Sequence, residues 1–272
     1  MIDLTFDYRG ATFCVVATSA SDDIASRIQR QGTFYEFDVL ERCEFYVKRL
    51  RPAGGLIIDA GAFIGNHTVF FANFCHAGAV IAFEACQSSF DVLIQTIARN
   101  GLNNVRAYNV ALGDEAEWGM IAVHNPENLG TNRVQRGRPD QPGAVRIVAL
   151  DDFLQSIGFA ESRVCLMKID VEGMECEVMR GATNTIAASK PILCMEMLDG
   201  AHMRRMLRIF RRSSYLIREC NGAAPTYLVT WESRIPRALI RLLNFGWLLL
   251  AYYGNNAWRW RYRRVIDIAL PV

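Results

Sequence analysis

The feature that most constrains the fold is the stretch from Leu56 to Thr68, which reads Leu-Ile-Ile-Asp-Ala-Gly-Ala-Phe-Ile-Gly-Asn-His-Thr. Its aliphatic start predicts a short buried strand that stops at Asp59. The glycines at Gly61 and Gly65 predict a turn, and the apolar residues after Thr68 predict a helix. A strand, a glycine turn and a helix in this order are typical of α/β folds that hold a ligand on backbone amides at a helix start.

The spacing of these glycines narrows the choice of ligand. The chain reads Asp-x-Gly-x-x-x-Gly, with Gly61 followed by a second glycine only at Gly65. This departs from the Gly-x-Gly-x-x-Gly pattern, so a dinucleotide pyrophosphate is not the first expectation. A glycine-rich connection in an ordinary α/β protein is the alternative that this stretch alone leaves open.

Length and composition bound the remaining classes. The 272 residues fit one large domain, or one domain with additions at its ends. A net charge of +2 gives no reason to expect a nucleic acid partner. The first nine residues hold Asp3 and Asp7 and no apolar run, so we expect a cytoplasmic protein. The eight cysteines are scattered without a C-x-x-C pair, which favours reduced thiols over zinc or disulfides.

The order of the predicted elements indicates an α/β fold. Residues 1–54 are read as an N-terminal hairpin followed by a helix from Phe37, and residues 55–231 as the main domain. Strands and helices alternate from Leu56, which predicts a mostly parallel sheet with right-handed crossovers. The expected strands are 56–58, 79–83, 105–110, 164–170 and 192–196, with helices at 88–99 and 174–188 and an antiparallel pair at 215–219 and 227–231.

One region breaks the alternation. Residues 118–123 and 145–150 are predicted strands, and between them 125–143 is rich in Pro, Gly, Asn and Arg. We interpret this region as a β insertion with a loop that contacts substrate.

Ligands in open α/β sheets lie beyond the carboxyl ends of the strands, where this chain repeatedly has acids. Glu84 stands at the distance from the glycine turn at which a carboxylate can accept both hydroxyls of a ribose. Asp59 beside the turn suits a ligand that carries positive charge. The other strand ends offer Gly61, Ala111, Asp170, Glu172 and Glu196.

These segments together resemble the FkbM family of S-adenosylmethionine-dependent methyltransferases. The resemblance runs from about Gly32 to Glu196 and is most specific in Lys168-Ile-Asp-Val-Glu-Gly-Met-Glu175. The other segments are Asp59-Ala-Gly-Ala-Phe-Ile-Gly-Asn-His-Thr68, Ala82-Phe-Glu84, Asn109-Val-Ala-Leu-Gly-Asp114, Leu150-Asp-Asp-Phe153 and Gly181-Ala182. One departure is Ala85-Cys86, where family members usually have proline after the ribose glutamate, so the adenine side of the pocket is expected to differ.

The resemblance implies an α/β, Rossmann-like class I methyltransferase fold with a mostly parallel seven-stranded sheet and an antiparallel edge. It implies S-adenosyl-L-methionine as cofactor and methyl transfer to a hydroxyl of a sugar, glycan or polyketide-like metabolite. The cofactor-binding residues that we carry over are Asp59, Gly61, Phe63, Gly65, Asn66, Thr68, Glu84, Ala111 and Asp170.

For catalysis we single out Asp170 as positioning residue, Glu172 as base or acceptor-orienting group, and His67 as a second base. In-line methyl transfer depends on alignment, and a base for the hydroxyl proton adds to the rate. Lys168, Asp170 and Glu172 as a structural ion-pair cluster, and His67 as a helix cap, are the alternatives. Asp170, Glu172 and Glu196 could also gather Mg²⁺, but their spacing demands no metal and we predict none.

Residues 232–272 follow the main domain as a basic and apolar extension. Arginines between 234 and 264 flank the run from Phe245 to Tyr253, which is too short to span a bilayer. Two interpretations remain open. One is a helix in the interface of the inner membrane surface. The other is a helix packed on the sheet or on a second subunit, as in a homodimer.

Two other functions stay as alternatives to an O-methyltransferase. A nicotinamide-dependent oxidoreductase would need the third glycine that the turn lacks. A non-catalytic, membrane-associated protein could keep the methyltransferase fold without turnover.

Overall fold

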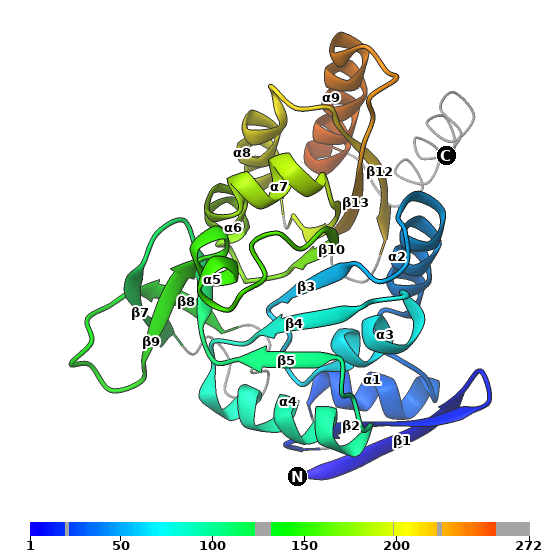
Figure 1. Cartoon of the computed structure of the whole chain (residues 1–272), viewed down its shortest axis with the longest axis vertical. Helices are drawn as coiled ribbons and strands as arrows, with labels where there is room; N and C mark the ends of the chain where they lie inside the picture. The colour runs from blue at the N-terminus through cyan, green and yellow to red at the C-terminus, as the bar shows by residue number, and fades with distance from the viewer. Residues whose placement is uncertain (20–21, 123–131, 198, 222–224, 254–272) are drawn as a thin grey trace.

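A computed structural model describes residues 1–19, 22–122, 132–197, 199–221 and 225–253. At its centre lies a seven-stranded sheet with the order β12-β13-β11-β10-β3-β4-β5 (Figure 1). Its strands are β3 (Leu56–Ala60), β4 (Ala79–Phe83), β5 (Val105–Tyr108), β10 (Val164–Ile169), β11 (Ile192–Glu196), β12 (Tyr215–Asn221) and β13 (Thr226–Trp231). The strand β13 lies between β11 and β12 and runs antiparallel to both. The other six strands of the sheet run in the same direction as one another. The predicted seven-stranded sheet with an antiparallel edge is confirmed.

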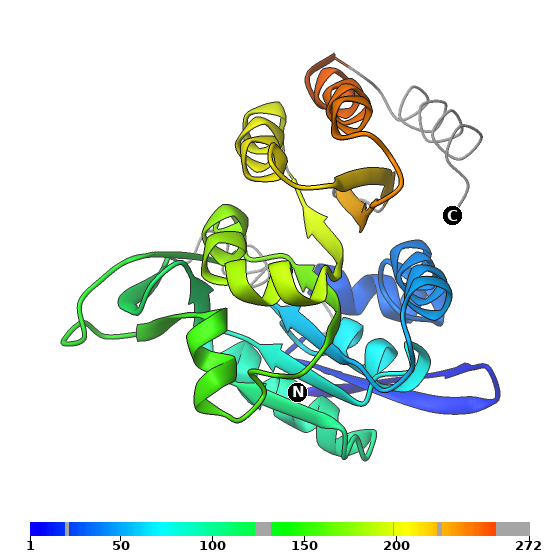
Figure 2. The same ribbon diagram turned by 45° about the horizontal axis from the view of Figure 1, so that its top comes forward.

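The sheet is covered on both faces because its strands alternate the direction of their buried side chains (Figure 2). Ile57 of β3 packs with α1 (Asp23–Gln31), α2 (Phe37–Leu50) and α3 (Asn66–Phe74). Its neighbour Ile58 packs in a separate cluster with α6 (Glu175–Gly181), α8 (Gly200–Phe210) and α9 (Arg237–Tyr253). The helix α4 (Gln87–Arg99) follows β4.

The N-terminal residues form the predicted hairpin, β1 (Ile2–Tyr8) and β2 (Ala11–Ala17). Thr96 and Asn100 hold this hairpin to the end of α4: Val16 N donates to Thr96 Oγ1 at 3.0 Å, and Cys14 N donates to Asn100 Oδ1 at 3.0 Å. Its apolar side shares one core cluster with α2 and the sheet. The hairpin is therefore packed into the main fold.

Several predicted bounds are wrong. The strand predicted at 105–110 ends earlier, as β5 at Tyr108, and a separate strand, β6 (Ala111–Gly113), follows it in a different sheet. The helix predicted at 174–188 is broken into α6 and α7 (Thr183–Ser189). A side chain on Gly181 would overlap the carbonyl oxygen of Gly113, so α6 ends where it touches β6. The helices α1, α5 (Leu150–Ser156) and α8 were not predicted.

The predicted β insertion is a second sheet with the order β6-β9-β7-β8. Its strands β7 (Glu117–Ala122), β8 (Arg133–Arg136) and β9 (Ala144–Ala149) project beside the carboxyl end of the main sheet (Figure 1). Of the predicted loop 125–143, residues 133–136 form β8 and residues 137–143 connect β8 to β9, while residues 123–131 lie outside the described residues.

The helix α9 packs against α8 and β12, with Ile240 and Trp247 buried. Asn244 bridges the backbone of β12, accepting from Ile217 N at 2.9 Å and donating to Tyr215 O at 2.8 Å. The extension is thus packed on the main domain along one side. Within the described ranges, no helix is long and apolar enough to cross a membrane. The predicted membrane-contact arginines from residue 259 onward lie outside those ranges.

All eight cysteines are free thiols, and six of them are buried.

Candidate active site

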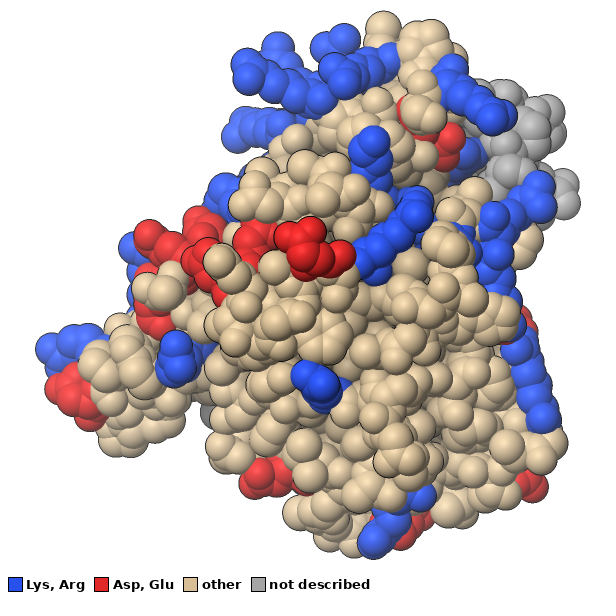
Figure 3. Space-filling view, in the orientation of Figure 1, with Lys and Arg blue, Asp and Glu red and all other residues tan. Residues whose placement is uncertain are grey.

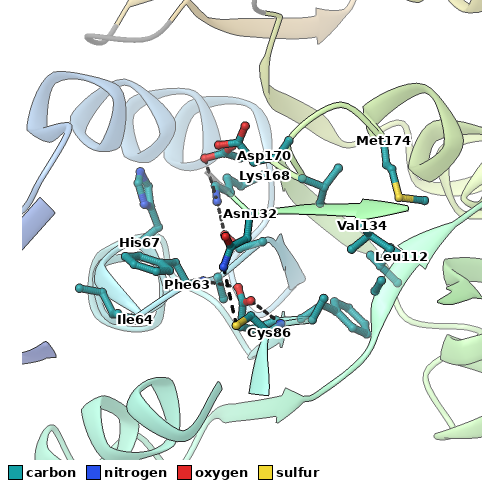
Figure 4. Close-up of a pocket in the computed structure, with 18 of the residues that line it drawn as sticks. Phe63, Ile64, His67, Cys86, Leu112, Asn132, Val134, Lys168, Asp170 and Met174 are labelled. Carbon is teal, nitrogen blue, oxygen red and sulfur yellow. Dashed lines mark hydrogen bonds and ion pairs between the residues drawn. The ribbon is translucent and has the colours of Figure 1, made fainter. Parts of the chain in front are cut away.

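One pocket opens at the carboxyl ends of β3, β4 and β10 (Figure 4). Its floor is the glycine turn after β3, and the turn after β10 forms one wall. The insertion supplies a further wall through Ile121, Asn132 and Val134, which confirms that this region reaches the site. The remaining lining residues are Ile24, Tyr35, Gly61, Ala62, Phe63, Ile64, Asn66, His67, Phe83, Glu84, Ala85, Cys86, Val110, Ala111, Leu112, Lys168, Asp170, Val171, Glu172 and Met174.

The glycine turn can only be built from residues without side chains at its two crowded points. Gly61 has φ +76°, and a Cβ there would overlap the carbonyl of Asp170. Gly65 has φ +91°, and a Cβ there would lie 2.8 Å from Leu93 Cδ1 in α4. The turn is therefore closely packed between the end of β10 and the helix α4.

Lys168 links the glycine turn to Asp59 and Asp170. Its Nζ donates to Gly61 O at 2.6 Å and lies 3.7 Å from Asp59 Oδ1 and 3.4 Å from Asp170 Oδ2. Burial by itself lowers the pKa of Lys168, but the charges of Asp170 and Asp59 outweigh it and raise the pKa above its ordinary value. Lys168 is therefore a permanently charged clamp at the pocket floor.

Asp59 is fully buried and accepts from Thr68 Oγ1 at 2.6 Å. Neither residue, nor Gly65, is part of the pocket lining. The structure places all three behind the wall, where they fix the turn and the start of α3. Their predicted contact with the cofactor stays a prediction.

Glu84 presents its carboxylate at the pocket with both oxygens already oriented. Oε2 accepts from Phe63 N at 2.9 Å and Oε1 accepts from Cys86 N at 2.8 Å. Each oxygen keeps a lone pair for a further donor, such as a ribose hydroxyl. Burial raises the pKa of Glu84 to about 7, against the two amide hydrogen bonds, which favour the ionised form.

The turn after β10 carries Asp170 and Glu172 on the opposite side of the pocket. Glu172 has φ +54°, a left-handed conformation that is uncommon for a residue with a side chain. Burial, and then the charges of Asp170 and Glu175, raise the pKa of Glu172 to about 7. Strained, perturbed acids of this kind are typical of functional sites.

Glu175 holds this turn from behind. Its Oε1 accepts from Val171 N at 3.2 Å and from Gly173 N at 3.1 Å. Its Oε2 lies 3.1 Å from Nε2 of the buried His202. Burial by itself lowers the pKa of His202, but hydrogen bonds to Cys176 and Glu175 raise it to about 9. His202 is thus part of a buried support for the turn.

His67 lines the pocket with its Nε2 3.4 Å from Glu36 Oε2. Glu36 precedes α2 with φ +52°, so its side chain turns toward α3. Burial alone would raise the pKa of Glu36, but the hydrogen bond and charge of His67 lower it below its ordinary value. The pair bridges α2 and α3 at the pocket rim.

The structure brings together eight of the predicted residues on one pocket lining, namely Gly61, Phe63, Asn66, His67, Glu84, Ala111, Asp170 and Glu172. Sequence reasoning assigned no role to Tyr35, whose backbone exchanges hydrogen bonds of 2.9 and 3.0 Å with the Asn66 side chain. It also missed Asn132 and Val134 individually. The position of Tyr35 just before the helix α2 could have pointed to it. The irregular β insertion could have pointed to Asn132 and Val134.

Comparison with known proteins decides the family. A family model, described as the methyltransferase FkbM domain, matches residues 59–218, more than half of the chain. The chain belongs to the FkbM methyltransferase family. Membership confirms the resemblance drawn from the motifs, and with it the predicted cofactor, S-adenosyl-L-methionine.

Two curated relatives of this FkbM chain carry methyltransferase names. "Methyltransferase 1" of Beauveria bassiana (strain ARSEF 2860) is 27% identical over 149 residues, covering 48% of the chain and 59% of the relative. "Methyltransferase sdnD" of Sordaria araneosa is 28% identical over 160 residues, covering 48% and 61%. The chain thus spans about three fifths of the length of these relatives.

Among solved structures, the methyltransferase FkbM from Methylobacillus flagellatus KT aligns with 67% of this FkbM chain and 45% of its own. The TM-score is 0.47 and the identity 16%, a similarity too low for comparing residues.

The pocket fits S-adenosyl-L-methionine by the chemistry of its donors and acceptors. Glu84 offers two acceptors for the ribose, and Ala111 with Leu112 offers an apolar wall for the adenine. Ala85 and Cys86 line the pocket where family members usually have proline, so this side is shaped by small side chains. Asp170 and Glu172 supply negative charge at the opposite end.

Proposed function

We propose that this chain is an active S-adenosylmethionine-dependent methyltransferase that methylates a hydroxyl oxygen. The proposal rests on one observation, which is that acids lie on two sides of one pocket. Glu84 lies on the β4 side, where a ribose would be held, and Asp170 with Glu172 lies on the β10 side. A ligand that extends between them has its sugar at one end and its reactive group at the other.

Each assigned residue has a definite task. Glu84 accepts the ribose hydroxyls, and the backbone of Phe63 and Ala111 shapes the adenosine site. Asp170, with Lys168 at 3.4 Å, positions the polar end of the ligand. Asp59 and Thr68 support the turn from behind. When bound, the cofactor supplies a methyl group that its cationic sulfur has already activated.

Glu172 is the group that we assign to the acceptor. Its pKa of about 7 leaves it able to take a proton near neutral pH, and it lines the pocket beside Asp170. It orients the acceptor hydroxyl and takes its proton as the carbon–oxygen bond forms and the carbon–sulfur bond breaks. A base of this kind contributes about 10² to 10⁴ in rate. Holding the acceptor in line supplies much of the remaining acceleration.

The acceptor that we propose is a sugar, glycan or polyketide-like metabolite. The class follows from the family resemblance and is compatible with a site whose outer wall is a β insertion. Ile121 and Val134 give that wall an apolar surface, and Asn132 adds an amide whose Oδ1 is buried without a hydrogen bond from any described residue. An amide left in this state can accept from a substrate hydroxyl.

The test is transfer of labelled methyl groups to a panel of nucleotide sugars, glycans and polyketides. We expect one class to be methylated, and Glu172→Gln to lower kcat by about 10² to 10⁴. Glu177→Gln is the matched control, because Glu177 lies on α6 outside the pocket and pairs with Arg180 at 2.7 Å. Equal rates for both variants would remove Glu172 from the mechanism.

The non-catalytic alternative makes the opposite prediction. If the Asp170→Ala and Glu172→Ala variants keep the biological effect of the chain, that effect does not depend on methyl transfer. A nicotinamide-dependent oxidoreductase would be stabilised against heat by NAD, whereas this proposal expects stabilisation by S-adenosylhomocysteine alone.

A further inference from the structure

Three carboxylates from two neighbouring strands converge at the outer edge of the pocket. Asp170 and Glu172 follow β10, and Glu196 ends β11, which pairs with β10 in parallel. One oxygen from each of the three lies within 4.8 Å of the other two. Like charges this close repel one another unless a cation or shared protons offset them.

Glu196 is the most informative member of this cluster. The residue is 8% exposed, and its Oε2 is buried without a hydrogen bond from any residue that the structure describes. Buried carboxylate oxygens are normally paired or bound to a metal. One oxygen of this same carboxylate lies within 4.8 Å of an oxygen of Asp170 and of Glu172, so a cation held by the three acids would also lie against Glu196.

The described cations do not fill that place. Two basic groups lie near the cluster: Lys168, whose Nζ is 3.4 Å from Asp170 Oδ2, and Arg133, whose charge acts on Glu172 without an ion pair to it. The Lys168 ammonium is shared with Gly61 O and Asp59, and no ion pair joins it to Glu172 or Glu196 in the described part of the chain. His202 lies against Glu175 and not against the three acids.

We propose that Asp170, Glu172 and Glu196 bind one hard divalent cation, Mg²⁺ or Mn²⁺. Carboxylate oxygens are the ligands that such ions prefer, and three of them leave coordination positions for water or for an acceptor oxygen. The sequence already offers these three acids as a possible Mg²⁺ set without demanding a metal, and the pairing of β10 with β11 brings Glu196 to the other two.

The role of the cation rests on the proposed function. Since Asp170 and Glu172 line the pocket, a cation on them lies where an acceptor hydroxyl would enter. A hydroxyl bound to it loses its proton more readily. With the cation bound, Glu172 would be one of its ligands and the hydroxyl proton would pass to water; without the cation, Glu172 would take that proton itself.

The experiment is a Mn²⁺ titration followed by electron paramagnetic resonance, using the full chain freed of metal with EDTA and no cofactor or acceptor. We expect one Mn²⁺ per chain, displaced by Mg²⁺, and at least tenfold weaker binding in Glu196→Gln and in Glu172→Gln. Glu161→Gln is the control, since Glu161 is exposed and precedes β10 at the other end of the strand.

Folding of the variants can be checked independently. Glu196→Gln keeps the side-chain shape and removes an uncompensated buried charge, so in EDTA it melts at or above the temperature of the wild type. A well-folded variant that loses Mn²⁺ therefore supports the site. Absence of bound Mn²⁺ on the wild type, or equal affinity in wild type and Glu196→Gln, would overturn it and indicate that the acids share protons.

Binding of S-adenosylhomocysteine, measured on the same samples, separates this inference from the proposed function. Mn²⁺ binding without S-adenosylhomocysteine binding would leave the metal site standing and contradict the methyltransferase. The reverse result would retain the methyltransferase and overturn the metal site.

Discussion

A side chain on Gly61 would overlap the backbone carbonyl oxygen of Asp170, so the glycine turn and the end of β10 touch directly. The two segments that line opposite sides of the pocket are therefore in direct contact. Any residue larger than glycine at this point must push the turn away from the acid that follows β10.

Gly61→Ala tests this contact. Gly143→Ala is a matched control, because Gly143 has a similar φ of +73° with no atom within 4 Å of an added Cβ, whereas Gly61 has φ +76°. Both variants bear the cost of a left-handed alanine, and Gly61→Ala bears the overlap as well. We expect it to lose about 1–3 kcal/mol more in free energy of unfolding, measured by urea denaturation. Equal losses in the two variants would show that the contact is not tight.

The His202–Glu175 pair predicts a pH dependence of stability. The folded pKa of His202, about 9, lies above its ordinary 6.5, so the charged histidine favours the folded state. This contribution is fully present below pH 6.5 and is lost as the pH rises through about 9. We expect His202→Gln to melt at lower temperature than the wild type at pH 6, and the difference to shrink toward pH 9.5. A difference that stays constant with pH would show that His202 is not charged in the fold.

His67 and Glu36 form the second pair at the pocket, 3.4 Å apart. If His67 is a second base, as its place on the pocket lining suggests, His67→Gln lowers kcat by at least tenfold and leaves the affinity for S-adenosylhomocysteine unchanged. Glu36→Gln keeps the His67 ring and changes only its partner, so it separates a catalytic role of His67 from a structural one. A cap role predicts equal losses of melting temperature in the two variants with no change in kcat.

The outer side of α9 carries the membrane prediction. Leu242, Phe245 and Leu249 are exposed at helical spacing, while Arg241 and the arginines of α8 flank them. Figure 3 shows basic side chains gathered over the α8 and α9 end of the molecule. An apolar stripe with arginines beside it complements an anionic lipid surface.

We therefore expect the chain to sediment with vesicles that contain anionic lipid and not with neutral ones. Leu242→Glu with Phe245→Glu should abolish sedimentation, whereas Ile94→Glu, an exposed apolar residue on α4, should not. If the double variant instead turns a dimer into a monomer in light scattering, the stripe is a subunit interface and the membrane prediction is wrong.

Local sequence patterns predicted the strands of the central sheet well. The bounds of β4 and β11 agree with those expected, because each continuous apolar run follows a glycine or a proline and meets a glutamate, Glu84 or Glu196. The helix α8 was missed although Met203, Met206 and Phe210 recur at helical spacing. The break between α6 and α7 has no local signal, because it comes from the contact of Gly181 with Gly113 in another sheet.

The site was predictable in its motifs and in only some of its long-range pairs. Glu84 and Asp170 follow strands whose ends a parallel sheet must bring together, so their roles could be assigned from order alone. The approach of Glu196 to Glu172 follows from the parallel pairing of β10 with β11, so the strand order could indicate it. The pairing of His67 with Glu36 depends on how α2 packs, and no spacing along the chain records it.

The proposed cofactor site depends most on Glu84, whose two oxygens accept from Phe63 N and Cys86 N and are thereby oriented for a ribose. The measurement that tests it most directly is calorimetric titration of the chain with S-adenosylhomocysteine at pH 8. One molecule should bind per chain, and Glu84→Gln should weaken binding by at least tenfold while Glu161→Gln leaves it unchanged. Absence of binding by the wild type, or equal affinity in Glu84→Gln, would contradict the account.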